Sequence, residues 1–403
     1  MMNTTHTLLR TAFAAALCAL SLQTAHVCAD APVSFPWSQS VACATSPSGV
    51  VVGATLWPGT YPWWYQVNSW ACILHTDMKE AGFLSHTGQP ASRALCVSPD
   101  GNYAGGTICN WAYGLPGGAL WDIRTGMLCD SGPLTVVRGI SMNAGRVVGA
   151  VGDKAASYDA TGVHMLSTAS KSEARAVSYD GQVIVGSTGM ESTARATVWT
   201  SAGELLLPLP PGRTNSLGLA CSADGSVIVG YSFTGYQDCT FTRWAFNATS
   251  GQYVPLEIGE TTPWGWPWFW SNPPIFIEAA SSPDGSVVSG GFNLTPIVWS
   301  QSAGILDLNA MFASLLSAHE GPPGEGYTVT AYIWQICGIC SDNRTLIGNA
   351  SLAYMNDLEG AGGGGIGNYG CRIVLPAPNA PAADLPVRDT TRTQTRSQAT
   401  SPN

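Results

Sequence analysis

Seven ten-residue windows of this chain close on the same residue, a glycine, and are spaced like the units of a repeating fold. Most contain a small polar residue, a turn pair and a short β-branched run, as in SYDGQVIVGS at 178–187. The closing glycines are Gly53, Gly106, Gly149, Gly186, Gly230, Gly290 and Gly348. They lie 53, 43, 37, 44, 60 and 58 residues apart. These intervals match the length of one β-propeller blade and predict seven repeated units.

Each window is typical of a β-hairpin. Pairs such as Asp180-Gly181 and Asp284-Gly285 accept the positive φ of a primed two-residue turn, which predicts that turn type here. The run that follows, Val183-Ile184-Val185 in one window, is apolar at successive positions. It therefore predicts a strand buried on both faces.

Two further strand-like pieces follow most windows. The first usually ends in an aromatic residue, as in ARATVW (194–199) and PIVW (296–299), and the second follows a glycine turn, as in GELLLPL (203–209). Four strands in each of seven units predict an all-β fold, a seven-bladed β-propeller. Such a blade can bury its flat faces only against its neighbours.

The two ends of the repeat region predict how the ring closes. The last unit has a third strand, GCRIVL (370–375), before Pro376 begins a polar tail. An unassigned piece, PVSFPW (32–37), precedes the first window. We expect this N-terminal piece to complete the last blade, because an unclosed ring would leave an exposed sheet edge.

The segments outside the repeats indicate export. Residues 1–29 are typical of a signal peptide, with the apolar run TAFAAALCALSL (11–22) and a small-residue cleavage pattern at Val27-Cys28-Ala29. A retained membrane anchor is the alternative. The propeller is expected over residues 30–375, and the polar residues 376–403 predict a disordered tail. The expected location is exported: secreted, at the cell surface or in the periplasm.

Cysteine number and charge limit the classes of function. Ten cysteines remain after the predicted signal, and an even number in an exported chain predicts disulfides, up to five. The pair Cys337 and Cys340 lacks a second CxxC or paired histidines, so neither a metal site nor a cofactor is expected. The formal charge is −9 without a basic tract, which argues against a nucleic-acid partner.

The repeat resembles that of a known family. The cadence A-x-S-x-D-G-x-V-x-V-G, then A-x-x-W and G-x-x-x-x-L, is similar to the HAF repeats of bacterial exported proteins, often autotransporter passengers. LDLNAMFASLL (306–316), GYTVT (326–330) and CSDNRTLIG (340–348) resemble the ends of such passengers. The resemblance covers roughly residues 42–375. This chain departs from the family by lacking the membrane barrel and by its tryptophan-rich insertions.

The insertions predict where a ligand binds. If strands a to d of each blade run up and down, the a–b and c–d turns share one face, here called the turn face. The b–c and d–a connections share the other, here called the insertion face. Four long insertions, 54–70, 257–275, 309–334 and 349–369, all fall on the insertion face, near units 6, 7 and 1.

Aromatic residues dominate two of these insertions, WPGTYPWWY (57–65) and WGWPWFW (264–270). Prolines stiffen both, so the rings can be displayed at little entropic cost. The predicted ligand-binding residues are Trp57, Tyr61, Trp63, Trp64, Tyr65, Trp264, Trp266, Trp268 and Trp270. The alternative is that these rings pack on each other as a lid over the disc.

Three functions remain open. The leading hypothesis is a monomeric binding or adhesion module for a glycan or a surface protein, with no membrane insertion and no catalytic residues. The second is a hydrolase or lyase acting on a polysaccharide through carboxylates of the insertion face. The third is a structural passenger remnant without a ligand.

Overall fold

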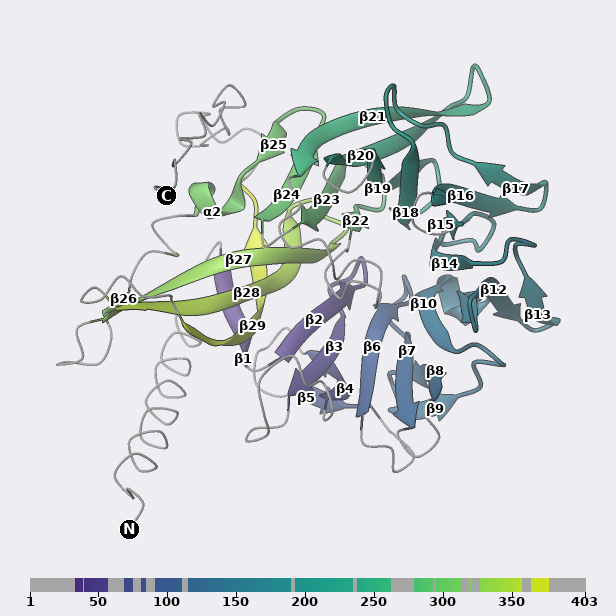
Figure 1. Cartoon of the computed structure of the whole chain (residues 1–403). Coiled ribbons are helices and arrows are strands. Elements are labelled where there is room, and N and C mark those ends of the chain that lie inside the picture. Colours follow the sequence, from purple (N-terminus) through teal and green to yellow (C-terminus); the bar gives the residue numbers. More distant parts are fainter. Residues whose placement is uncertain are drawn as a thin grey trace, which may run out of the picture.

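The computed structural model is a ring of seven antiparallel sheets around a common axis, a seven-bladed β-propeller (Figure 1). The predicted fold class is confirmed. The described residues are 33–38, 40–56, 69–74, 81–84, 91–110, 115–189, 193–234, 238–261, 279–292, 295–312, 316, 319–320, 327–356 and 364–376.

The first six blades each contain four strands in chain order. Blade 1 comprises β2 (Ser40–Thr45), β3 (Val51–Leu56), β4 (Ser69–Leu74) and β5 (Ala81–Phe83). Blade 2 comprises β6 (Ala91–Val97), β7 (Tyr103–Asn110), β8 (Leu115–Asp122) and β9 (Met127–Cys129). Blade 3 comprises β10 (Val136–Ile140), β11 (Val147–Val151), β12 (Lys154–Asp159) and β13 (Gly162–Met165). Blade 4 comprises β14 (Ser172–Val177), β15 (Ile184–Thr188), β16 (Arg195–Thr200) and β17 (Gly203–Leu206). Blade 5 comprises β18 (Asn215–Cys221), β19 (Val227–Thr234), β20 (Asp238–Asn247) and β21 (Gln252–Thr261). Blade 6 comprises β22 (Ala279–Ser281), β23 (Val287–Phe292), β24 (Thr295–Ser300) and β25 (Gly304–Leu306).

Blade 7 is closed by the N-terminal strand, as predicted. It contains β26 (His319–Glu320), β27 (Tyr327–Ile339), β28 (Thr345–Asn356) and β29 (Gly364–Val374), and β1 (Val33–Ser38) pairs antiparallel with β29. Strand β2, which follows β1 directly, contacts β27, β28 and β29. The two ends of the repeat region therefore meet in one blade.

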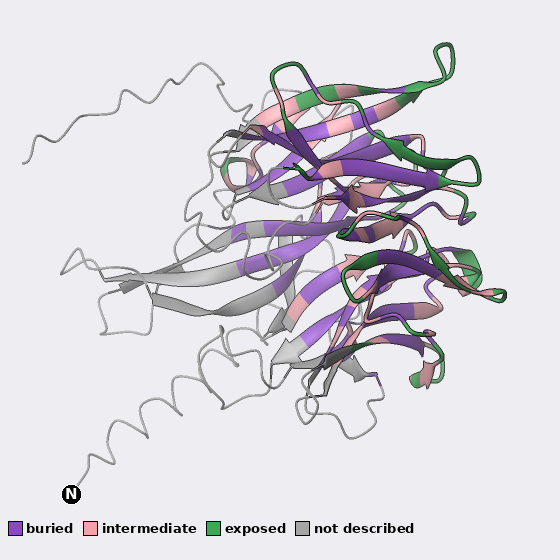
Figure 2. Ribbon diagram, turned by 45° about the vertical axis from the view of Figure 1, so that its right-hand side comes forward, coloured by how far each residue is buried: buried purple, intermediate pink, exposed green. Residues whose placement is uncertain are grey.

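The hydrophobic core lies between the blades, because the second strand of each blade is buried on both faces. In β15 the side chains of Ile184 and Val185 are both buried. Val185 packs in one cluster with Ile228 and Trp244 of the next blade. Figure 2 shows this distribution, with buried residues inside the blades and exposed residues in the turns.

The a–b turns are longer than the predicted two-residue primed turns. In blade 4 the loop is closed by the Ser178 N–H donating to the carbonyl of Val183, 2.8 Å away. The Asp180 carboxylate accepts from the Ser178 hydroxyl at 2.6 Å and from the Gln182 N–H at 3.0 Å. Only the glycine of the Asp-Gly pair has positive φ, +76° at Gly181. The aspartate's hydrogen bonds therefore select the longer loop.

The structure describes the side chains of nine cysteines and forms no disulfide between any two of them, so the predicted disulfides stay a prediction. Seven of the nine are buried. Burial raises the pKa of the Cys371 thiol, so that it remains neutral at pH 7. Such a cysteine packs as a small apolar side chain.

The four predicted insertions are shorter than expected, because strands continue into them. β21 pairs with β20 as far as Thr261, and β28 pairs with β27 as far as Asn356. Strand β29 begins at Gly364, within the glycine-rich sequence GAGGGGIG (360–367). Blade 7 consequently reaches further from the ring than the other blades (Figure 1). No helix in the described part of the chain is long and apolar enough to cross a membrane.

Candidate functional site

A β-bulge interrupts the first, innermost strand in six of the seven blades. In β14 the register shifts between Ala174 and Ala176, so Arg175 is the extra residue of the bulge opposite β15. A bulge turns the extra side chain away from the regular alternation of the strand. The bulged residue nearest the a–b turn in each of these strands is Cys43, Leu95, Arg138, Arg175, Leu219 or Cys337, and β27 has a further register shift between Ile333 and Gln335.

The closing glycines of the sequence repeat make these bulges possible. A Cβ on Gly186 would overlap the carbonyl oxygen of Glu173 on the neighbouring innermost strand. The same overlap with a backbone carbonyl would arise at the closing glycine of every bulged blade. In the sixth blade, Gly290 faces the ring of Phe241 instead, and the described pairing of β22 has no bulge. The repeated glycine therefore allows the close approach of two strands at the bulge.

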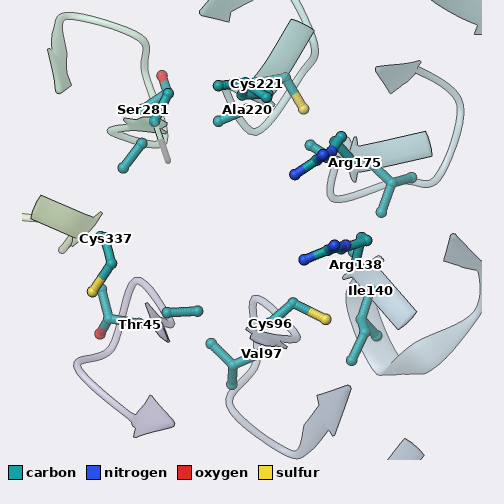
Figure 3. Close-up of a pocket in the computed structure, with 18 of the residues that line it drawn as sticks. Thr45, Cys96, Val97, Arg138, Ile140, Arg175, Ala220, Cys221, Ser281 and Cys337 are labelled. Atoms are coloured by element: carbon teal, nitrogen blue, oxygen red, sulfur yellow. The ribbon is translucent and has the colours of Figure 1, made fainter. Parts of the chain in front are cut away.

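The bulged residues surround a cavity of about 220 Å³ on the propeller axis, lined by all seven innermost strands (Figure 3). Because each innermost strand runs toward the turn face, the residues after the bulge lie nearer that face. The wall there includes Ile140 and Val177, and Pro47, Pro99 and Tyr179 of the a–b turns also line the cavity. The cavity thus extends from the bulges to the turn face.

Backbone hydrogen bonds join neighbouring a–b turns around the cavity. The Met142 N–H donates to the Tyr179 carbonyl, Tyr179 to Ala223, and Ala223 to Pro283, each at 2.8 Å. The Ser341 N–H donates to Pro47 at 3.0 Å. The three remaining turns have Pro47, Pro99 or Pro283 at this position, and proline has no N–H to donate. These bonds fix the positions of adjacent turns on the turn face.

Two arginines and one glutamate form an ion-pair cluster at the axis. Arg138 Nε and Arg175 Nη2 bind the Glu173 carboxylate at 2.9 and 2.7 Å. Each of the three side chains is between a fifth and a quarter exposed. Figure 3 shows both guanidinium groups pointing into the cavity. Burial opposes ionisation of Glu173, but the two guanidinium groups outweigh it and hold its pKa below the usual value.

Four thiols also line the cavity, those of Cys43, Cys96, Cys221 and Cys337. Burial raises the pKa of Cys96 and of Cys221 to about 12. Both are therefore neutral near pH 7, and a neutral thiol is a poor nucleophile. Within the described residues, no three His, Cys, Asp or Glu side chains form a group able to hold a metal.

The predicted aromatic residues lie outside the described part of the chain: Trp57, Tyr61, Trp63, Trp64, Tyr65, Trp264, Trp266, Trp268 and Trp270. The strand ends that flank them are described. β3 ends at Leu56, β4 begins at Ser69 and β21 ends at Thr261. All three positions are on the insertion face, opposite the a–b turns.

The axial arginines were not predicted from the sequence. Arg138 and Arg175 each lie eleven residues before the closing glycine of their blade. Leu95, Leu219 and Cys337 occupy the same position in theirs. Comparing this position across the repeats would have found the bulged residues. That their side chains point toward the axis depends on the bulge, which hydrophobic alternation does not show.

No family model matches the chain, and no curated protein matches it either. Among solved structures, TolB from Acinetobacter baumannii is 14% identical, with a TM-score of 0.45. The match covers 63% of this chain and 62% of that one, less than two thirds of its length. The β-propeller domain of Cps50 (Swd1) from Myceliophteria thermophila is 13% identical, with a TM-score of 0.46, over 84% of this chain and 97% of that one. At such identity the similarity concerns the fold alone.

Proposed function

We propose that this β-propeller is an exported binding module that holds a glycan on its insertion face without changing it covalently. The aromatic residues of segments 57–65 and 264–270 form the platform. Export rests on the signal-like residues 1–29. A ligand held by loops on a closed ring suits a protein outside the cell, where the fold must persist without repair.

The observation that carries the proposal is the unequal construction of the two faces. On the turn face, six-residue loops such as Ser178–Val183 are closed by their own hydrogen bonds and joined to their neighbours. On the insertion face, β27, β28 and β29 are 13, 12 and 11 residues long. The innermost strands of the other blades have three to seven residues. Because β27 ends at its a–b turn, its extra length projects from the insertion face.

The position of blade 7 supports a shared site. Its strands contact blade 1 through β2 and blade 6 through β22, β23 and β24. Segment 57–65 belongs to blade 1, and segment 264–270 precedes blade 6. Both aromatic segments are thus attached to blades next to the longest sheet.

The chemistry of the two segments favours a ligand that has a flat face of C–H groups. Trp266 and Trp268 alternate with glycine or proline, and proline lowers the entropy that a displayed ring loses on binding. Aromatic faces give large contact area and attract the polarised C–H edges of other rings. A sugar ring offers such edges, which is why we take a glycan as the ligand class.

A glycan array tests the proposal with native protein and a Trp266→Ala/Trp268→Ala double variant. Native protein should bind a restricted set of glycans, and the double variant should lose at least tenfold in affinity. Phe246→Ala is the matched control, since this exposed aromatic lies on β20, outside both segments. Its binding should equal the native.

Two results would overturn the proposal. One is identical binding, or no binding, by native protein and the double variant. The other is release of reducing ends or unsaturated products from the bound glycan, which would instead favour a polysaccharide-acting hydrolase or lyase.

A further inference from the structure

We propose that Arg138 and Arg175 make the axial cavity a binding site for a small monoanionic carboxylate. This site opens toward the turn face, away from the proposed glycan platform, and does not depend on it. Its elements are the two guanidinium groups, the shared Glu173 and the apolar wall between the bulges and the a–b turns.

Arg138 has more N–H donors than there are described acceptor atoms bonded to them. Its Nε donates to Glu173 Oε1 at 2.9 Å, whereas Nη1 and Nη2 donate to no residue in the described part of the chain. A guanidinium carries five N–H donors in a planar fork that matches a carboxylate. Both guanidinium groups point into the cavity (Figure 3). Arg138 can therefore bind a second carboxylate through its terminal nitrogens while it keeps Glu173.

Glu173 lies on the side of the arginines that faces away from the cavity. It precedes Arg175 by two residues on β14, and β14 runs toward the turn face. Cavity-lining residues on this strand begin at Arg175 and do not include Glu173. Glu173 thus orients the guanidinium groups from the side of the insertion face. Their other side faces the cavity, toward the turn face.

Charge balance selects a monoanion. Two guanidinium groups and one carboxylate leave a net charge of +1 in the cluster. Among the described residues that line the cavity there is no Asp or Glu. Burial, with Cys221 nearby, raises the pKa of Tyr179 to about 12, so its hydroxyl is neutral. A monoanion neutralises this charge, whereas a dianion such as sulfate would leave negative charge next to Glu173.

The apolar wall and the volume of the cavity limit the polarity and size of the group that carries the carboxylate. Ile140, Val177 and Leu219 provide apolar surface beside the arginines. The cavity of about 220 Å³ is below the range of about 300–1,000 Å³ that is usual for drug-sized ligands. A carboxylate on a stem of a few carbons fits these limits. It can come from a free short-chain acid or from the C-terminus of a protein chain.

Isothermal titration calorimetry on the full chain tests this site. Propionate is compared with propionamide, and the peptide Gly-Gly-Ala with a free C-terminus is compared with its C-terminal amide. At least one carboxylate should bind, at least tenfold more tightly than its amide. The propionate arm identifies a free acid as the source, and the peptide arm identifies a chain terminus.

Variants connect binding to the arginine. Arg138→Gln should weaken carboxylate binding at least tenfold. Arg124→Gln removes the same charge from an exposed rim position, where Arg124 pairs with Asp122, and should bind like the native protein. Arg138→Lys keeps the charge without the planar fork. It should bind more weakly than native even if Arg138→Gln does not fold.

Three results would overturn the proposal: amides that bind as tightly as acids, Arg138 variants that bind as tightly as the native protein, or tighter binding of sulfate, titrated in the same way, than of either carboxylate. The absence of all carboxylate binding at millimolar concentrations would also overturn it. The glycan array does not involve this cavity, so failure of one proposal is distinguishable from failure of the other.

Discussion

At the residue scale, the closing glycine of the repeat explains how the sequence forms the wall of the axial cavity. Gly186 lies opposite Ala174, directly before the bulge that releases Arg175 from the strand pairing. A side chain at Gly186 would force β14 away from β15 and remove the bulge. The closing glycine that defines the repeat is thus needed for the bulge beside the axial cavity and not for the a–b turn.

Replacement of a closing glycine should therefore destabilise the fold. We expect Gly186→Ala to lower the free energy of unfolding by about 2–3 kcal/mol, because its Cβ would overlap the backbone carbonyl of Glu173. Urea unfolding measures the loss. The matched control is Gly117→Ala, where the nearest atom to a new Cβ is 3.9 Å away. That control should change stability by less than about 0.5 kcal/mol, and equal effects of the two substitutions would refute the explanation.

The sequence alone predicts some residues well and others poorly. Trp121 and Trp244 lie in the third strands of their blades, as the repeat predicts, and both are fully buried. The turn type is wrong because Asp180 accepts hydrogen bonds that a two-residue turn cannot offer. Arg138 and Arg175 are missed because the bulge changes the side of the strand on which strict alternation of side chains would place them.

At the element scale, ring closure depends on one short strand. β1 pairs with β29 from Val33↔Ile373 to Ser38↔Tyr369, with one irregularity between Ser34 and Trp37. The sequence predicts this strand because PVSFPW has no partner of its own and the last blade lacks its outermost strand. By contrast, the sequence pattern predicts residues 349–369 as an insertion and misses the extension of β28 and β29 into it, since glycine-rich sequence hides strand pairing.

Deletion of residues 33–38 should expose the edge of β29 and destabilise the protein by several kcal/mol. The synthetic peptide PVSFPW, added to the shortened chain, should pair with β29 and recover part of the lost thermal stability. A peptide with the same residues in scrambled order is the control. Unchanged melting of the shortened chain would show that β1 does not close the ring.

At the scale of the whole molecule, the repeat separates two faces that are built differently. Short turns joined by hydrogen bonds surround the axial cavity on one face. The long strands of blade 7 and the strand ends that flank the predicted aromatic segments, Leu56, Ser69 and Thr261, lie on the other. The number of blades, their strand order and the closing strand follow from the sequence pattern. The position of the predicted platform stays a prediction, because its residues are outside the described part of the chain.

The distance between Ser34 and Arg372 tests the closed ring most directly. These residues are paired across β1 and β29, so their Cα atoms should be about 5 Å apart. In an open stack of seven sheets spaced about 10 Å apart, the same residues would be separated by about 60 Å. Spin labels attached through non-canonical amino acids at both positions avoid the native cysteines, and pulsed electron resonance measures their separation. A short, narrow distance distribution is expected, and a long one would contradict the ring.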